Sequence, residues 1–162
     1  MPTISIPIVG VVFLALCLNT VARAECTANS LVVVVNKANP TEGLSMAQLR
    51  RLLLGDLRNW PDKKQVFLIT PDPQSEAFKC VLSTVVRMTS AEYRRYIANA
   101  EFRGEEPLQL RTVAPGSAAA KAVSSTPGSI AILEAGTLPS IAASVRVLRI
   151  NGQHPGGPGY PL

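Results

Sequence analysis

A continuous apolar run, Leu31 to Val35, limits the possible folds of this chain more than any other segment. After Leu31 every residue of the run is valine, a β-branched residue that favours an extended strand. Because successive side chains of a strand point to opposite faces, a strand without polar residues must be buried on both faces. The run therefore predicts a strand in a sheet that is covered by helices.

The segments that follow alternate between helix and strand patterns. Ser45 and Gln48 form a capping box at the start of a helix that Gly55 ends, and Thr89 with Glu92 opens another helix in the same way. The other predicted elements are strands at 65–70, 129–133 and 145–150 and helices at 75–87 and 117–125. This order predicts an α/β fold with a mixed four- or five-stranded sheet and helices on both faces. We expect a short antiparallel connection between the last two strands.

The first 24 residues have the pattern of an export signal. Ile4 to Ala22 is almost unbroken apolar sequence, and Ala22-Arg23-Ala24 matches the small-x-small site of signal peptidase. We expect residues 1–24 to be a signal peptide cleaved after Ala24, and residues 25–162 to form one periplasmic domain. An uncleaved membrane anchor is the alternative, because no Lys or Arg precedes the apolar run.

Export would leave two cysteines, Cys26 and Cys80, in a compartment where disulfides persist. In the helix predicted at 75–87, the apolar residues share one face and Cys80 points away from it. A small buried hydrophobe would lie on the apolar face, so this interpretation of Cys80 is disfavoured. Cys26 and Cys80 are therefore a candidate disulfide, although spacing alone does not bring their Cα atoms together.

Several kinds of chemistry lack support in the sequence. The chain has a single histidine, His154, in a Gly- and Pro-rich tail, so we expect no catalytic residue, metal site or cofactor. The net charge of +5 comes from scattered bases, and aromatic residues make up only 5% of the chain. Nucleic acid is therefore not an expected partner, and an enzyme is not expected either.

The helix that begins at Ser75 is the candidate ligand site. A helix N-terminus that follows a strand presents free backbone N–H groups to an anion, and the Ser75 hydroxyl can add to them. Thr70 and Asn36 each end a predicted strand, so we expect them to face the same crevice. The alternative is that Ser75 is only a helix cap, since serine is preferred there without any ligand.

The order of short motifs along the chain resembles that of one protein family. These motifs are VVVVNKANP at 32–40, Leu44-Ser45, Leu54-Gly55 followed by Trp60, the Ser75 helix start, TPGSI at 126–130, and NG at 151–152 with YPL at 160–162. Together they are similar to the substrate-binding proteins of phosphate ABC transporters. The resemblance implies one lobe of a type 2 periplasmic binding protein, a single-lobe short form of a protein that closes two lobes over its ligand.

The resemblance also implies a function. It implies binding of a small anion such as phosphate at Ser75 and Thr70, with a second lobe, a homodimer mate or a permease as partner. The chain departs from the family pattern in having no Lys or Arg between Lys64 and Lys79, while Asp72 occupies the turn before Ser75. An ionised Asp72 would repel an anion unless the ligand shares a proton with it. A non-catalytic protein-interaction module of the cell envelope, which keeps the fold without tight anion binding, is therefore the alternative.

Overall fold

The computed structural model describes residues 26, 30–105, 108–114 and 117–162. The predicted signal peptide and the start of the predicted domain at residue 25 lie outside the described residues. The elements, in chain order, are β1 (Leu31–Asn36), β2 (Gly43–Leu44), α1 (Met46–Leu54), β3 (Phe67–Thr70), α2 (Glu76–Val81), the π-helical turn η1 (Leu82–Val86), α3 (Ser90–Phe102), β4 (Leu110–Thr112), α4 (Ser117–Ser125), β5 (Ser129–Glu134), the 3-10 turn η2 (Ala135–Thr137), α5 (Leu138–Ile141), β6 (Val145–Val147) and β7 (Arg149–Ile150).

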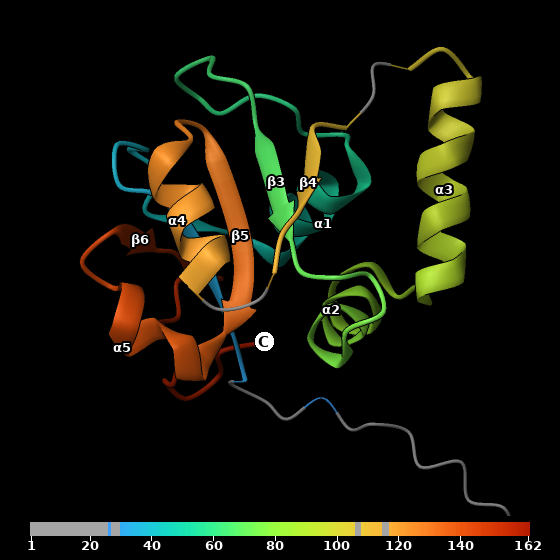
Figure 1. Ribbon diagram of the computed structural model, residues 1–162. Helices are drawn as coiled ribbons and strands as arrows, with labels where there is room; N and C mark the ends of the chain where they lie inside the picture. The colour runs from blue at the N-terminus through green and yellow to red at the C-terminus, as the bar shows by residue number, and fades with distance from the viewer. Residues whose placement is uncertain (1–25, 27–29, 106–107, 115–116) are drawn as a thin grey trace, which may run out of the picture.

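Five strands form the main sheet in the order β4-β3-β5-β1-β6 (Figure 1). Strands β3, β4 and β5 run parallel to one another, whereas β1 is antiparallel to both of its neighbours, β5 and β6. The predicted mixed sheet is thus confirmed. The expected short antiparallel connection between the last two strands is wrong, because β1 lies between β5 and β6.

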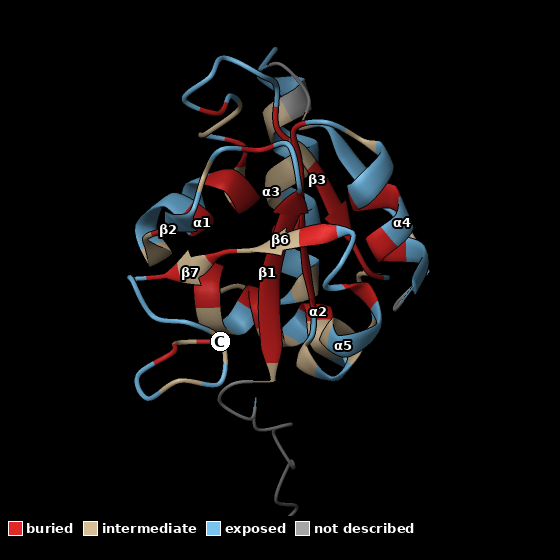
Figure 2. Cartoon of the chain, turned by 90° about the vertical axis from the view of Figure 1, so that its left-hand side faces the viewer, coloured by how far each residue is buried: buried red, intermediate tan, exposed pale blue. Residues whose placement is uncertain are grey.

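Every residue of β1 is buried, as the apolar run predicts (Figure 2). Leu31, Val33 and Val35 pack on one side of the sheet with α1, α2 and η1, while Val32 and Val34 pack on the other side with α4 and α5. The predicted helices on both faces are therefore confirmed. Helix α3 stands away from the sheet in Figure 1 and buries Tyr93, whose hydroxyl donates a 2.7 Å hydrogen bond to the Leu53 carbonyl.

Local sequence signals set the starts and ends of several helices. The capping box of Ser45 and Gln48 forms at the start of α1, and Gly55 ends that helix in the left-handed region at φ 79°. Glu92 accepts hydrogen bonds from the Thr89 backbone N–H at 2.7 Å and from its hydroxyl at 2.9 Å before α3. These caps lie where the sequence predicts them because each depends only on residues a few positions apart.

The C-terminal part of the chain differs from the prediction. The single strand expected at 145–150 is two short strands, β6 and β7, on either side of Leu148, which is fully buried and bonds the Val33 carbonyl through its N–H at 2.9 Å. Strand β7 then pairs with β2 in a separate two-stranded sheet. The irregular Gly- and Pro-rich tail ends with Tyr160 and Leu162 buried in the core on the α1 and α2 side.

Candidate functional site

The turn before α2 is built by backbone and side-chain hydrogen bonds of Asp72. Its carboxylate accepts from the Gln74 N–H at 2.7 Å, and its carbonyl accepts from the Ser75 N–H at 2.8 Å. This Asx-type turn brings Ser75 to the N-cap position, where its hydroxyl accepts from the Phe78 N–H at 3.2 Å. Helix α2 then continues without a break into η1, so the helical segment runs from Glu76 to Val86.

Thr70 ends β3 on the same side of the sheet as α2. Its side chain shares a face with Leu68, because residues two apart on a strand point the same way, and Leu68 packs in the core beside α2. Thr70 is 2% exposed, and its Oγ1 has no hydrogen-bond partner among the residues that the structure describes. An unpaired buried hydroxyl costs on the order of 1–3 kcal/mol, so an added polar partner at this point would be favourable.

The expectation that Asn36 faces the same crevice as Thr70 is wrong. Strand β1 is antiparallel to β5, and β5 is parallel to β3, so the carboxyl ends of β1 and β3 lie at opposite ends of the sheet. Asn36 also shares a face with Val34, which packs against α4 rather than α2. Its side-chain N–H groups bond the carbonyls of Val123 and Ser124, both at 2.9 Å, so it completes the end of α4.

Charges near the start of α2 are mainly negative. The Asp72 side chain is exposed, and Glu76 occupies the first turn of the helix, where a carboxylate is stabilised by the positive end of the helix dipole. Lys79 bonds Glu76 at 2.7 Å, one turn further along. The helix end therefore already has an intramolecular anion, and the basic residue nearest to Ser75 along the chain is paired with it.

The predicted disulfide between Cys26 and Cys80 is present, with the two Cα atoms 5.5 Å apart. Cys80 is only partly buried on α2, as its position off the apolar face predicts. The bond ties the segment before β1 to the outer side of α2, across 54 residues of sequence. Such a bond is typical of proteins in oxidising compartments.

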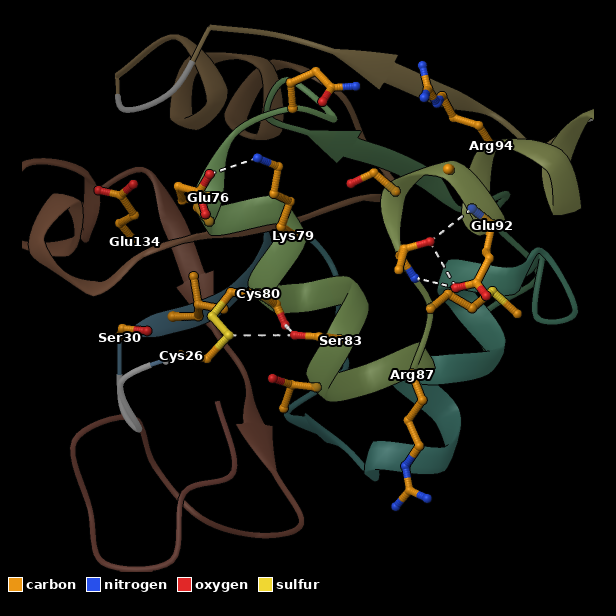
Figure 3. Close-up of a pocket in the computed structure, with 18 of the residues that line it drawn as sticks. Cys26, Ser30, Glu76, Lys79, Cys80, Ser83, Arg87, Glu92, Arg94 and Glu134 are labelled. Carbon is orange, nitrogen blue, oxygen red and sulfur yellow. Dashed lines mark hydrogen bonds and ion pairs between the residues drawn. A yellow bond between two sulfur atoms is a disulfide. The ribbon is translucent and has the colours of Figure 1, made fainter. Parts of the chain in front are cut away.

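A broad groove, which the sequence did not reveal, lies along the outer side of α2 and η1 (Figure 3). Its volume is about 1440 Å³, and it is bordered by the disulfide, the start of α3 and the loop after β5. We call it the α2–α3 groove and define it by Gln74, Lys79, Thr84, Arg87 and Arg94 together with the disulfide. The groove reaches the start of α2 through Gln74 and Glu76, whereas Thr70, Asp72 and Ser75 do not line it.

Other kinds of site find no support in the part of the chain that the structure describes. No cluster of three or more potential metal ligands occurs among those residues. His154 is exposed in the C-terminal tail. Across the same residues, no helix has the length and apolar character needed to span a bilayer.

Two of the sequence motifs meet in space although they lie far apart in the chain. The Trp60 indole N–H donates a 2.7 Å hydrogen bond to the Gly128 carbonyl, and Trp60 is 3% exposed. Gly128 has φ +83°, and a Cβ there would lie 2.3 Å from the Gln65 carbonyl oxygen. The Pro-Gly turn before β5 and the tryptophan loop before β3 are thus one packing unit.

The mixed sheet and the helices on both of its faces define an α/β fold. No protein-family model matches the chain, and no curated protein matches it. Solved structures do match it. The chain is similar to PstS from Borrelia burgdorferi, with 15% identity and a TM-score of 0.64 over 78% of this chain and 49% of that one.

Two further solved structures give the same result. An ABC-type phosphate transport receptor from Vibrio cholerae has 19% identity and a TM-score of 0.61, over 78% of this chain and 48% of that one. A phosphate-binding protein from Stenotrophomonas maltophilia has 15% identity and a TM-score of 0.61, over 79% of this chain and 40% of that one. The resemblance inferred from the motifs is confirmed at the level of the fold, and the chain spans about half the length of these proteins or less.

Proposed function

We propose that this chain is an exported, non-catalytic solute-binding protein that binds a small anion such as phosphate at the edge formed by Thr70 and the start of α2. The observation that carries this proposal is the buried Thr70 hydroxyl, which has no partner among the described residues and ends the strand that leads into the Ser75 helix cap. The free N–H groups of the first helical turn would supply the remaining donors. The similar solved structures named above are phosphate-binding and phosphate-transport proteins.

The proposed site needs a partner to close it. This chain covers 49% and 48% of the length of the first two similar structures, so about half of each has no counterpart here. A second lobe from another protein, a homodimer mate or a permease would supply the opposite wall of the cleft. Export to the periplasm, with cleavage after Ala24, is part of the proposal, and the disulfide supports it.

Asp72 would act as a selector in this site. A carboxylate beside the anion repels a fully ionised ligand and accepts a hydrogen bond from a protonated one. Inorganic phosphate carries such a proton near neutral pH and sulfate does not. We therefore expect phosphate to bind more tightly than sulfate, and Asp72→Asn to reduce the difference between them.

Calorimetric titration of the mature protein with phosphate tests the proposal, with Thr70→Val as the site variant. Valine has nearly the same shape as threonine but lacks the hydroxyl, so this change removes an unpaired buried group. We expect the free energy of unfolding to stay equal or rise by about 1 kcal/mol, because the desolvation cost of the hydroxyl disappears. We expect phosphate affinity to fall by about tenfold at the same time.

Ser75→Asp is a second site variant, and it keeps the helix cap. Aspartate caps a helix as well as serine does, so the fold should be retained, while its charge should prevent an anion from approaching. Absence of binding heat at millimolar phosphate in the unmodified protein would contradict the proposal. So would equal phosphate affinity in the unmodified protein and both variants.

The alternative is a protein-interaction module that keeps the fold without tight anion binding. The carboxylates of Asp72 and Glu76 beside the helix start favour this alternative, since both disfavour a bound anion. Retention of a folded protein with no response to phosphate, together with recovery of one consistent crosslinked protein in the cell envelope, would favour it over solute binding.

A further inference from the structure

The turn before α2 contains one peptide group that is held at both ends. The Ser75 N–H donates to the Asp72 carbonyl at 2.8 Å, which closes a β-turn with Pro73 at its first central position, where proline is favoured. The next residue is Gln74, whose N–H donates to the Asp72 carboxylate at 2.7 Å. The carbonyl of Pro73, which belongs to the same peptide group, accepts from the Ser90 hydroxyl at 3.1 Å. This peptide group therefore cannot tilt without weakening one of the two bonds.

Ser90 comes from the part of α3 that is fixed in place. It is the first residue of α3 and directly follows Thr89, which donates two hydrogen bonds to the carboxylate of Glu92 (Figure 3). Three residues after Ser90, the Tyr93 ring packs edge-on against Phe78 of α2, with the ring centroids 5.8 Å apart. Among the α3 side chains that the structure describes, only Tyr93 is buried. The first turn of α3 thus carries Ser90 on a firm attachment to α2.

The Ser90 hydroxyl is not needed to begin α3. Thr89 already caps that helix, because its hydroxyl accepts from the Glu92 N–H at 3.2 Å. Ser90 is half-buried, and its hydroxyl bonds a carbonyl that lies 17 residues earlier in the chain rather than a group of its own helix. The bond therefore serves the turn before α2 and not α3 itself.

We propose that Ser90 is a positioning residue of the anion site at Thr70 and the start of α2, and that it acts through Asp72. Its hydroxyl holds the carbonyl of the peptide group between Pro73 and Gln74, and the N–H of that group holds the Asp72 carboxylate. Asp72 is exposed, and an exposed carboxylate that is not held turns into water and acts on a bound anion more weakly. This role rests on the function proposed above, in which Asp72 distinguishes a protonated anion from a fully ionised one.

The ratio of phosphate affinity to sulfate affinity, from calorimetric titrations of the mature protein, tests the proposal. Ser90→Ala should stay folded, because alanine is the most favourable helix residue. We expect this variant to lower the ratio by about three- to tenfold, the effect of one lost hydrogen bond. A residue needed only for folding would weaken both anions alike and leave the ratio unchanged. Ser90→Thr keeps the hydroxyl and should keep the ratio of the unmodified protein.

Ser124→Ala is the matched control. The Ser124 hydroxyl also donates to a backbone carbonyl, that of Lys121 at 3.0 Å, but it lies on α4, which packs on the other face of the sheet. The ratio should therefore be the same in this variant as in the unmodified protein. An unchanged ratio in Ser90→Ala would overturn the proposal, and so would an equal fall of the ratio in Ser124→Ala.

Amide hydrogen exchange without any anion separates this proposal from the proposed function. Loss of the Ser90 hydroxyl lets the turn open more often, so we expect the amides of Gln74 and Ser75 to exchange about three- to tenfold faster in Ser90→Ala. Absence of phosphate binding in the unmodified protein would overturn the role in selectivity together with the proposed function, whereas faster exchange would still support the hold of Ser90 on the turn. Unchanged exchange of both amides would overturn the positioning role, whatever the anion affinities are.

Discussion

At the scale of single residues, Gly128 has a conformation and a neighbour that together exclude other side chains. Its φ of +83° favours glycine, and its carbonyl is the acceptor for the Trp60 indole. Because the Gln65 carbonyl that faces it belongs to the backbone, a side chain at this position cannot be relieved by a rotamer change. The motif glycine is therefore required by packing between two loops, independently of any ligand.

We expect Gly128→Ala to lower the free energy of unfolding by about 3 kcal/mol or more, because left-handed strain and a backbone clash add together. Gly104→Ala is the control, since Gly104 has φ +73° but no atom of the described residues lies within 4 Å of the point that its Cβ would occupy. That variant should lose only about 1–2 kcal/mol, the cost of the left-handed conformation. Urea unfolding of both variants measures the difference, and equal losses would show that the contact with Gln65 is unimportant.

At the scale of elements, the direction of β1 decides which residues can act together. Local signals in the sequence predicted the capped starts of α1 and α3, and the apolar run predicted β1 itself. The sequence did not predict that β1 runs against β3, because strand direction depends on pairing with β5 much later in the chain. For the same reason β4 was missed, since Leu110–Thr112 is exposed and is a strand only through its pairing with β3.

The structural role of Asn36 leads to a prediction at the same scale. Asn36→Asp keeps the oxygen that accepts from the Ala38 N–H at 2.9 Å, but turns a carboxylate toward the carbonyls that end α4. We expect a loss of about 3 kcal/mol in the free energy of unfolding, because a buried charge would meet two acceptors. Thermal unfolding measures this loss.

Asn99→Asp, on the exposed surface of α3, is the control and should change stability by less than about 0.5 kcal/mol. Phosphate affinity measured where Asn36→Asp is still folded should be unchanged. A loss of phosphate binding with unchanged stability would contradict this prediction and indicate that Asn36 contacts the ligand.

At the scale of the whole molecule, the described residues form a core on both sides of one sheet. The motif order in the sequence indicated this fold, since the motifs lie in β1, at the starts and ends of helices, in the turn into β5 and in the C-terminal tail. The candidate site was predicted less well. Thr70 and Ser75 end and begin neighbouring elements, as expected, but the α2–α3 groove depends on side chains from segments that meet only in the folded chain.

Two buried tyrosines make the stability of the whole molecule sensitive to alkaline pH. Burial raises the pKa of Tyr160 to about 12, and it also raises the pKa of Tyr93. In the unfolded chain tyrosine has a pKa near 10, so above this pH the unfolded state loses protons that the folded state keeps. The contribution of protonated Tyr160 to the free energy of unfolding is therefore complete below about pH 10 and is lost as the pH rises toward 12.

We expect the urea midpoint of the unmodified protein to fall between about pH 9 and pH 11. Tyr160→Phe removes one of the two titrating groups, so its midpoint should fall less over the same interval. Circular dichroism at both pH values measures the change. An identical fall in the variant and the unmodified protein would show that Tyr160 does not contribute to the alkaline loss.

If the chain is exported N-terminus first, as we propose, the place of β5 between β1 and β3 decides when the main sheet can form. Strands β1 and β3 have no pairing with each other, so neither can enter the main sheet beside the other until β5 has emerged. Cys26 and Cys80 both precede β5, and their bond can therefore close while the sheet is still open. An oxidant acting early in translocation would tie the segment before β1 to α2, and so shorten the search by which β5 inserts between β1 and β3.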